Sequence, residues 1–141
     1  MSNIKKVSDE FSAGGQPTPD TLKQLADEGY KSVVNLRAPD EAGVLDDEEQ
    51  QAQAVGLEYV NVPLNSTSAK DGLTAKVLRE LEQLPTPVYF HCGAGGRANA
   101  LALIALATQQ QLNREQVLAK AQELGINPKQ AHLKQFLDSL S

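Results

Sequence analysis

Hydrophobic residues recur along the chain with two spacings, one typical of amphipathic helices and one typical of short strands. Leu22 and Leu25 share one face of a helical segment. Thr18 before them can cap a helix, and Gly29 after them can end it. The next segment, residues 31–36, is rich in β-branched residues and predicts a strand. A helix-to-strand alternation therefore begins near the amino-terminal end.

The same alternation continues to residue 91, after which helical patterns follow one another. Residues 88–91 form a short, nearly continuous apolar run typical of a central parallel strand. Residues 97–111 are rich in Ala and Leu around most of the circumference, which predicts a largely buried helix. Asn127 is a possible cap for the last helix. Helices are expected over residues 18–29, 46–55, 73–84, 97–111, 114–124 and 128–140, and strands over residues 31–36, 57–63 and 88–91.

Helices interleaved with short strands predict a three-layer α/β fold, with a short, mostly parallel sheet flanked by helices. The chain has 141 residues, and neither an internal repeat nor a linker divides it, so we expect one domain spanning residues 1–141. The longest apolar run, Ala100 to Ala107, is far shorter than a membrane span, and the first residues lack an apolar signal segment. We therefore expect a cytoplasmic protein without a membrane partner.

Charge and cysteine content exclude several classes of function. The net charge is −5, which argues against a whole-surface attraction to nucleic acid or to anionic membranes. The single cysteine, Cys92, cannot form an intrachain disulfide. The spacing of Cys and His residues matches no zinc site, so no metal and no cofactor are expected. A binding site for an anion would have to be local.

The most informative segment is residues 91–98, which reads His-Cys-Gly-Ala-Gly-Gly-Arg-Ala. It follows a predicted parallel strand, and ligands of open α/β sheets bind beyond the carboxyl ends of such strands. A Gly-rich turn before a helix directs successive backbone N–H groups to one point at the positive end of the helix dipole. This geometry is typical of a cradle for a tetrahedral oxyanion. The residues expected to line it are Gly93, Ala94, Gly95, Gly96 and Arg97.

Two side chains add reactivity to this cradle. Cys92 lies at its edge, where the same field stabilises a thiolate, so we expect an accessible nucleophile at neutral pH. Arg97, in the first turn of the helix, can bind two oxygens of an anion bidentately and stabilise the charge of a transition state. The simpler alternative for Cys92 is a buried structural thiol.

This loop resembles the active-site loop of the cysteine-dependent phosphatases, which include the protein tyrosine and dual-specificity phosphatases. Further motifs resemble the bacterial branch called beta-lactamase-hydrolase-like phosphatases, and the resemblance covers roughly residues 3–110. It implies a dual-specificity-phosphatase-like fold, a phosphocysteine intermediate and no metal. The motifs are Gly-Gln-Pro-Thr-Pro at residues 15–19, Val-Asn-Leu-Arg at 34–37 with Glu41, Glu-Tyr-Val-Asn-Val-Pro at 58–63, and Pro87-Val88.

The chain departs from the phosphatase pattern at three positions. Four residues rather than five separate Cys92 from Arg97, and this shorter loop also resembles that of rhodanese-type sulfurtransferases. Ala98 stands where phosphatases usually carry a Ser or Thr that stabilises the cysteine as a leaving group. The general acid Asp expected shortly after the strand at residues 57–63 is missing, and Asp71 is the acidic candidate in the loop that follows.

Several neighbouring residues are expected to support the site. His91 should point away from Cys92, hydrogen-bond the backbone and position the loop. Arg37 should form an ion pair with Glu41 that braces the loop after its strand, or else add positive potential to the site. The acidic residues 46–49 suit a first helical turn, and His132 is expected on a helix surface.

These features predict a cysteine-dependent phosphatase. Its substrate would be a phosphomonoester, either a phosphorylated small molecule or a phosphoprotein. Aryl phosphates such as phosphotyrosine are favoured, because a phenolate leaves with little help from an acid. Two alternatives stay open. One is a rhodanese-like sulfurtransferase or persulfide-handling enzyme, and the other is a phosphate-binding module with weak turnover.

Overall fold

The computed structural model describes residues 4–41, 43, 47–65, 69, 72–93 and 95–140. At its centre is a five-stranded sheet with the strand order β1-β2-β5-β3-β4. Neighbouring strands run parallel, except for the antiparallel pair of β1 and β2. The strands are β1 (Lys5–Lys6), β2 (Phe11–Gly14), β3 (Ser32–Asn35), β4 (Glu58–Asn61) and β5 (Val88–His91).

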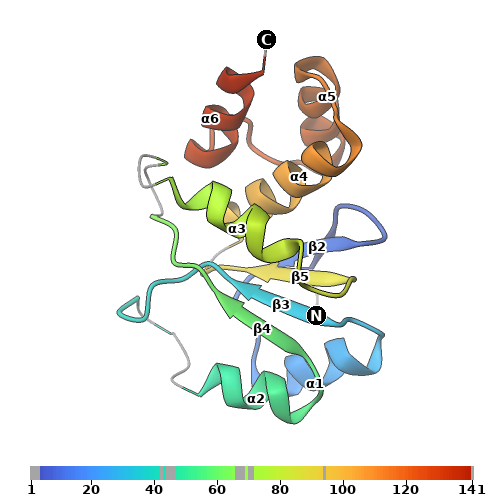
Figure 1. Cartoon of the computed structure of the whole chain (residues 1–141), viewed down its shortest axis with the longest axis vertical. Coiled ribbons are helices and arrows are strands. Elements are labelled where there is room, and N and C mark those ends of the chain that lie inside the picture. Colours follow the sequence, from blue (N-terminus) through green and yellow to red (C-terminus); the bar gives the residue numbers. More distant parts are fainter. Residues whose placement is uncertain are drawn as a thin grey trace.

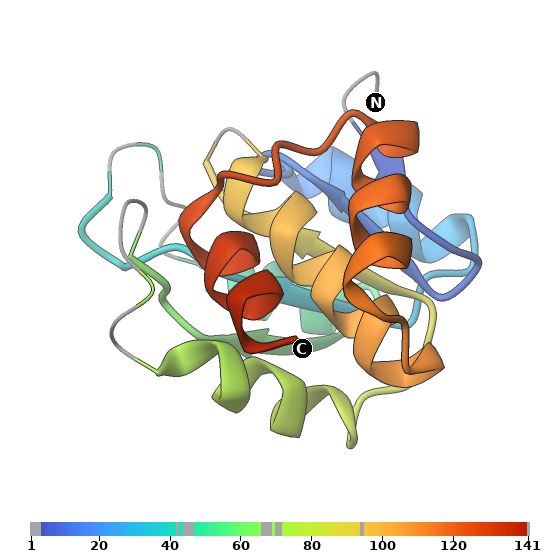
Figure 2. The ribbon, with the colours of Figure 1, turned by 90° about the horizontal axis from the view of Figure 1, so that it is seen from above.

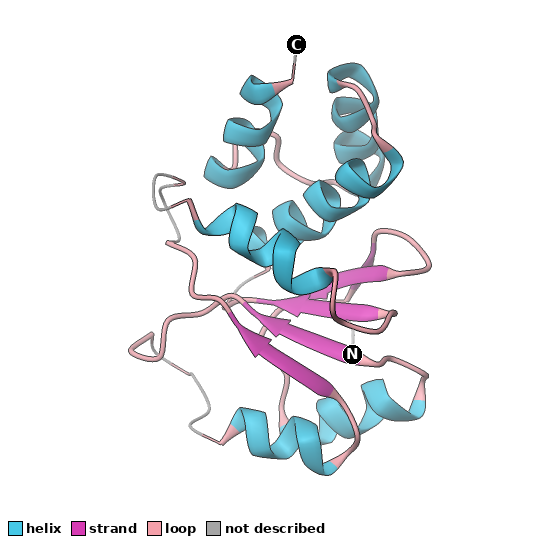
Figure 3. Cartoon of the chain, in the orientation of Figure 1, coloured by secondary structure: helices cyan, strands magenta, loops and turns pink. Residues whose placement is uncertain are grey.

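Helices cover both faces of this sheet (Figures 1 and 3). The helices α1 and α2 lie on one face, whereas α3 and α4 lie on the other. Figure 2, which looks down on this second face, shows α4 between α5 and α6. The predicted three-layer α/β fold with a mostly parallel sheet is confirmed. The helices are α1 (Pro19–Asp27), α2 (Glu48–Ala54), α3 (Leu73–Leu81), α4 (Gly96–Gln110), α5 (Arg114–Leu124) and α6 (Ala131–Ser139).

Strands β1 and β2 are absent from the predicted elements. Strand β2 has the sequence Phe-Ser-Ala-Gly, whose small residues carry little β-propensity, so the local pattern did not reveal it. Its conformation comes from its neighbours, because β2 pairs in parallel with the central strand β5 and all four of its residues are buried. This pairing places Gly14 opposite His91 and brings the following residue, Gly15, to the edge of the cysteine loop.

The last helix also differs from its prediction. The helix α6 begins at Ala131, and the side chain of Gln130 caps it by accepting hydrogen bonds from the backbone N–H groups of His132 and Leu133. Asn127 instead accepts from the N–H of Lys129 in the preceding turn. His132 is fully buried and was wrongly expected on the surface, because the apolar face of α6 packs against α4.

The side chains of β5 alternate between the two faces of the sheet, as in any strand. Phe90 packs into the main core with α4, and Cys92 just beyond the strand lies on the same side. Tyr89 packs into a second core with residues of α1 and α2. His91 stacks on the Tyr89 ring at a centroid distance of 6.2 Å and so lies on the α1 and α2 side. Phe90 and His91, the last two residues of β5, thus point to opposite faces of the sheet.

The parallel strands β2, β3, β4 and β5 all point their carboxyl ends toward one edge of the sheet. The segments that leave these strands therefore meet there, and the candidate site is assembled from them. Across the part of the chain that the structure describes, no helix is both long enough and apolar enough to cross a membrane.

Candidate active site

The loop after β5 wraps the sulfur of Cys92 at the amino-terminal end of α4. Cys92 Sγ accepts hydrogen bonds from the backbone N–H groups of Gly95 at 3.1 Å and Ala98 at 3.4 Å. Gly95 has a φ of +106°, which a residue with a side chain rarely adopts, so the turn into the 15-residue helix requires glycine there. Two backbone N–H donors therefore point at the sulfur.

Cys92 is only 1% exposed, so the expectation of an accessible thiol is wrong for this structure. The loop packs tightly against the end of β2, where a side chain at Gly15 would come within 3.1 Å of the carbonyl oxygen of Gly93. The sulfur is therefore shielded from solvent in this structure. Ala94, which was expected in the cradle, lies outside the described residues.

Arg97 lies in the first turn of α4 with a buried side chain. Its Nη1 donates to the backbone carbonyl oxygens of Leu36 at 3.2 Å and Leu64 at 2.9 Å, which follow β3 and β4. The structure thus ties the guanidinium to two strand ends as well as to its own helix.

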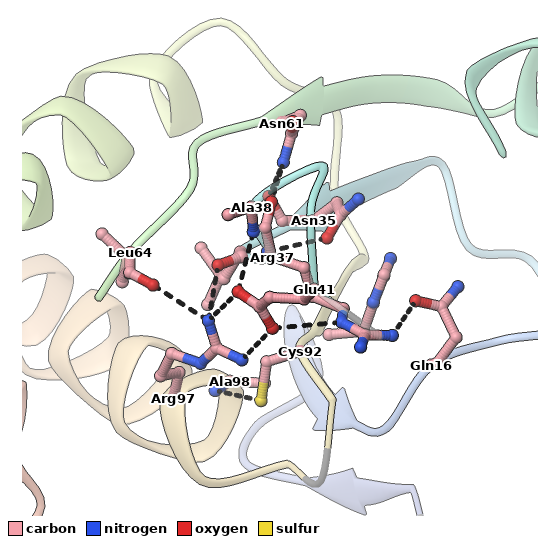
Figure 4. Close-up of polar contacts among 12 residues, drawn as sticks. Gln16, Asn35, Arg37, Ala38, Glu41, Asn61, Leu64, Cys92, Arg97 and Ala98 are labelled. Atoms are coloured by element: carbon pink, nitrogen blue, oxygen red, sulfur yellow. Dashed lines mark hydrogen bonds and ion pairs between the residues drawn. The ribbon is translucent and has the colours of Figure 1, made fainter. Parts of the chain in front are cut away.

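Glu41 holds the same guanidinium as a bidentate partner (Figure 4). Its Oε2 accepts from Arg97 Nη1 and its Oε1 from Arg97 Nη2, both at 2.8 Å. The Nη1–Nη2 edge of Arg97 is therefore occupied. The contacts of Glu41, Leu36 and Leu64 are with Nη1 and Nη2, so the Nε–Nη2 edge is the one that an anion could use, and Cys92 is a further partner of this guanidinium.

The ion pair changes how both partners titrate. The hydrogen bond from Arg97 lowers the pKa of Glu41 from 4.5 to about 2, helped by the N–H of Ala38 and by Arg37. The hydrogen bond to Glu41 in turn raises the pKa of Arg97. Glu41 is therefore ionised at neutral pH and cannot supply a proton to a leaving group.

This lowered pKa predicts a specific acid sensitivity. A carboxyl with a lower pKa in the folded state stabilises the fold above its unfolded pKa, and that contribution is lost as pH falls through the folded value. The window runs from about pH 4.5 down to about pH 2. Urea unfolding should show that the free energy of unfolding falls by up to about 3 kcal/mol across this pH window. Solvent screening makes the fall smaller. In Glu41→Gln this loss should be absent, and an equal loss in both proteins would contradict the prediction.

Arg37 is also buried, and the predicted ion pair with Glu41 is present. Its Nε donates to Glu41 Oε1 at 3.3 Å, and its Nη1 donates to Gln16 Oε1 at 2.9 Å. A side chain at Gly93 would lie 3.7 Å from Arg37 Nη2, so this guanidinium also borders the cysteine loop. Arg37 therefore both pairs with Glu41 and lies beside the cysteine loop.

Two asparagines hold the segment that carries Arg37 and Glu41. Asn35 Oδ1 accepts from the backbone N–H of Arg37 at 2.9 Å. Asn61 Nδ2 donates to the backbone carbonyl oxygens of Asn35 at 2.8 Å and Arg37 at 2.9 Å. Both asparagines belong to motifs that the sequence resemblance already contained, at residues 34–37 and 58–63, but the sequence alone assigned them no role.

His91 points away from Cys92 as predicted, but its ring contacts a side chain rather than the backbone. Its Nε2 lies against Glu48 Oε2 of α2, and both side chains are buried. Glu48 and its second partner, Gln16, were missed as site residues. Glu48 belongs to an acidic stretch that suits any helix start, and 43 residues separate it from His91, so no local signal could reveal the contact.

Two further predictions about the site concern the general acid and a metal ion. Asp71, the candidate general acid, lies outside the described residues. Within the described ranges, the structure contains no group of three or more His, Cys, Asp or Glu side chains that could hold a metal ion.

Known proteins share both the sequence pattern and the fold. A family model described as "DSP-PTPase phosphatase fused to NAD+ Kinase" matches residues 2–137. A beta-lactamase hydrolase-like protein from Xylella fastidiosa is 29% identical over 120 residues, which cover 82% of this chain and 28% of that protein. The chain thus spans about a quarter of the length of the curated relatives that it matches.

Solved structures agree on the fold. A DUF442 protein from Shewanella putrefaciens CN-32 is 23% identical with a TM-score of 0.77, over 98% of this chain and 88% of that one. TpbA from P. aeruginosa is 16% identical with a TM-score of 0.72, over 99% of this chain and 85% of that one. With its fold in agreement and the family model matching nearly every residue, the chain belongs to the family of dual-specificity and protein tyrosine phosphatase domains that this model describes.

Proposed function

We propose that one domain spanning residues 1–141 hydrolyses phosphomonoesters, with Cys92 as the nucleophile and Arg97 as the phosphate-binding side chain. The observation that carries this proposal is the convergence of three groups at one point. They are the sulfur held by two backbone N–H groups, the amino-terminal end of α4, and the guanidinium of Arg97, which interacts with Cys92. Membership of a phosphatase family supports the same conclusion.

The reaction would proceed in two displacements. The Cys92 sulfur attacks phosphorus, so that an S–P bond forms while the ester P–O bond breaks and its electrons leave with the substrate oxygen. Water then attacks phosphorus, the S–P bond breaks, and inorganic phosphate and the thiolate are released. In both steps, the charge on the equatorial oxygens would be stabilised by Arg97 and by the N–H groups of residues 93–97.

Aryl phosphates are the proposed substrate class. A phenol has a pKa near 10, about five units below that of an alkyl alcohol, so a phenolate leaves with little help from a proton donor. The ionised Glu41 cannot donate a proton, which makes this difference important. TpbA, which shares the fold, has been crystallised with phosphotyrosine, and this supports an aryl substrate here. Either a small phosphorylated molecule or a phosphoprotein would fit this chemistry.

Asp71 is the proposed general acid for less activated substrates. If it protonates the leaving oxygen, Asp71→Asn should lower the rate on alkyl phosphates by about 10²–10⁴-fold. The rate on p-nitrophenyl phosphate should change much less, because nitrophenolate needs no protonation. Steady-state rates on both substrates measure this difference. An equal, small effect on both would remove Asp71 from the mechanism.

The competing function is sulfur transfer, which the short interval between Cys92 and Arg97 favours. The deciding experiment measures p-nitrophenyl phosphate hydrolysis and thiosulfate–thiol sulfur transfer side by side, with Cys92→Ser as the control in each assay. Phosphate release that depends on Cys92 supports the phosphatase. Sulfur transfer that depends on Cys92, without phosphate release, would replace it. Phosphate binding without either turnover would identify a phosphate-binding module.

A further inference from the structure

Glu48, in the first turn of α2, is a buried carboxylate that no step of the proposed reaction uses. Its side chain is only 2% exposed. Burial of an ionised carboxylate is strongly unfavourable unless hydrogen bonds and opposite charge compensate it. Partial satisfaction would therefore destabilise α2. Two of the partners that compensate this charge, His91 and Gln16, belong to the candidate site, and Tyr59 interacts with the carboxylate as well.

The two oxygens of this carboxylate have different partners. Oε2 lies against His91 Nε2, and Oε1 accepts a hydrogen bond from Gln16 Nε2. Burial raises the pKa of Glu48, but the hydrogen bonds and the electrostatic interaction with its partners outweigh burial and keep the pKa below its ordinary value. Glu48 is therefore an anion with both oxygens engaged.

The contact with Gln16 continues toward Arg97. Because Gln16 Nε2 donates to Glu48, its Oε1 is turned toward Arg37 and accepts from Arg37 Nη1 at 2.9 Å. The Arg37 guanidinium donates to Glu41, and Glu41 binds both Nη atoms of Arg97. One unbroken series of side-chain contacts thus links α2 to the anion-binding arginine (Figure 4 shows its part from Gln16 to Arg97).

The contact with His91 leads to the nucleophile. His91 directly precedes Cys92, and its backbone carbonyl oxygen accepts from the N–H of Leu36 at 2.9 Å. The ring is held on the α1 and α2 side of the sheet by Glu48 and by stacking on Tyr89. These contacts fix the last strand residue from which the cysteine loop departs.

We propose that Glu48 is a positioning residue for the phosphatase reaction, acting on Cys92 through His91 and on Arg97 through Gln16. The inference rests on the proposed function, since it assigns Glu48 a part in that reaction. A carboxylate is needed because both of its oxygens must accept. If Cys92 or Arg97 is mispositioned, kcat falls more than the affinity for the substrate does, because the reacting atoms must be aligned in the transition state.

Glutamine is the sharpest replacement because it keeps the size of Glu48 but has one accepting oxygen. If that oxygen serves Gln16, the new amide N–H faces His91 Nε2, and the ring must carry its proton on Nδ1. Nδ1 is buried, and no described residue accepts from it. If the oxygen serves His91 instead, the Gln16 amide must turn and present N–H groups to Arg37. Either arrangement breaks the contact with one of the two partners, and the loss of the carboxylate charge weakens the hydrogen bond to the other.

The experiment compares Glu48→Gln with wild type and with Glu49→Gln, whose exposed neighbouring carboxylate is a matched control. For p-nitrophenyl phosphate, Glu48→Gln should lower kcat by about 10–100-fold and change KM by less than about threefold. Glu49→Gln should match wild type. Rates are measured well below the Tm of each variant, so that all molecules are folded. A lower Tm with unchanged kcat would make Glu48 a purely structural residue and overturn the proposal.

A second variant tests the series of contacts that leads from Glu48 through Gln16 to Arg97. Gln16→Met breaks the link to Arg37 while leaving the contact between Glu48 and His91. Gln16 is partly exposed, so this change is tolerated more easily than one at Glu48. Because Glu48→Leu removes both accepting oxygens and so breaks the contact with Gln16 as well, adding Gln16→Met to Glu48→Leu should slow the reaction by no more than about a further threefold. Fully multiplicative losses would overturn the link through Gln16.

An activity-independent measurement separates this proposal from the proposed function. In the unliganded protein, the NMR signals of the Nε–H groups of Arg37 and Arg97 report their hydrogen bonding. Both should shift or broaden in Glu48→Gln and remain in place in Glu49→Gln. If wild type lacks Cys92-dependent turnover, the proposed function fails while these signals still test the contacts. Unchanged signals in Glu48→Gln would overturn the positioning role, whatever the activity.

Discussion

Replacement of Cys92 by serine is expected to lower the turnover of p-nitrophenyl phosphate on the order of 10⁴-fold or more. A serine hydroxyl stays protonated at neutral pH and needs a base to become a nucleophile. Among the described residues, Cys92 Sγ interacts with the backbone N–H groups of Gly95 and Ala98 and with the guanidinium of Arg97, which stabilise an anion but cannot remove a proton. Initial rates of nitrophenolate release measure the loss.

The same variant should still bind inorganic phosphate with an affinity close to that of wild type. The amides of the loop and the guanidinium of Arg97 are unchanged by Cys92→Ser, and they provide the binding contacts in the proposed mechanism. Calorimetric titration with phosphate distinguishes this outcome from a collapsed loop. Retention of turnover in Cys92→Ser would contradict the assignment of the nucleophile, whereas loss of both turnover and binding would indicate a damaged site.

The backbone around Cys92 bears on the missing Ser or Thr after Arg97. In the second displacement, the sulfur leaves phosphorus as a thiolate and needs hydrogen-bond donors. Ala98 supplies a backbone N–H to Sγ at 3.4 Å, and Gly95 supplies another at 3.1 Å. The amide of the residue that lacks a hydroxyl thus donates to the sulfur itself. This arrangement keeps hydrolysis of a phosphocysteine chemically reasonable despite the departure from the phosphatase pattern.

Local sequence patterns were sufficient for most of the fold. Strand β5 and helix α5 have the predicted bounds, and α4 is largely buried from Arg97 to Ala107, as its composition indicated. The pattern failed at β2, where Phe-Ser-Ala-Gly has no strand signal of its own and becomes a strand by pairing with β5. It failed at His132 because burial depends on which helix packs above, which a single segment cannot reveal.

In the candidate site, too, contacts between residues close in sequence could be predicted, whereas contacts between distant residues could not. The cysteine loop could be predicted because its groups follow one another along the chain, and the Arg37–Glu41 pair because the two residues are only four positions apart. The bidentate contact of Glu41 with Arg97 joins residues 56 positions apart, and Glu48 meets His91 across 43. Such contacts depend on the strand order of the sheet, which β2 completes and which the local patterns did not contain.

Arg97 is the residue whose chemistry is least replaceable after Cys92. Its Nη1–Nη2 edge is held by Glu41, so a phosphate would bind through Nε and Nη2. Lysine keeps the charge, but its single ammonium cannot bind Glu41 and two phosphate oxygens in one plane. We expect Arg97→Lys to lower kcat/KM for p-nitrophenyl phosphate by about 10²–10³-fold, as for the loss of an oxyanion donor.

The exposed residue Arg79 on α3 offers a matched control, because Arg79→Lys makes the same chemical change outside the site. Arg79→Lys should retain wild-type kinetics. Since Arg97→Lys also weakens the pair with Glu41, its Tm is measured together with its rate, and rates are compared on folded protein. Calorimetry should show phosphate affinity falling in Arg97→Lys but not in Arg79→Lys. Normal phosphate binding and normal turnover in folded Arg97→Lys would show that the guanidinium does not hold the substrate, and the cradle would then depend on backbone N–H groups alone.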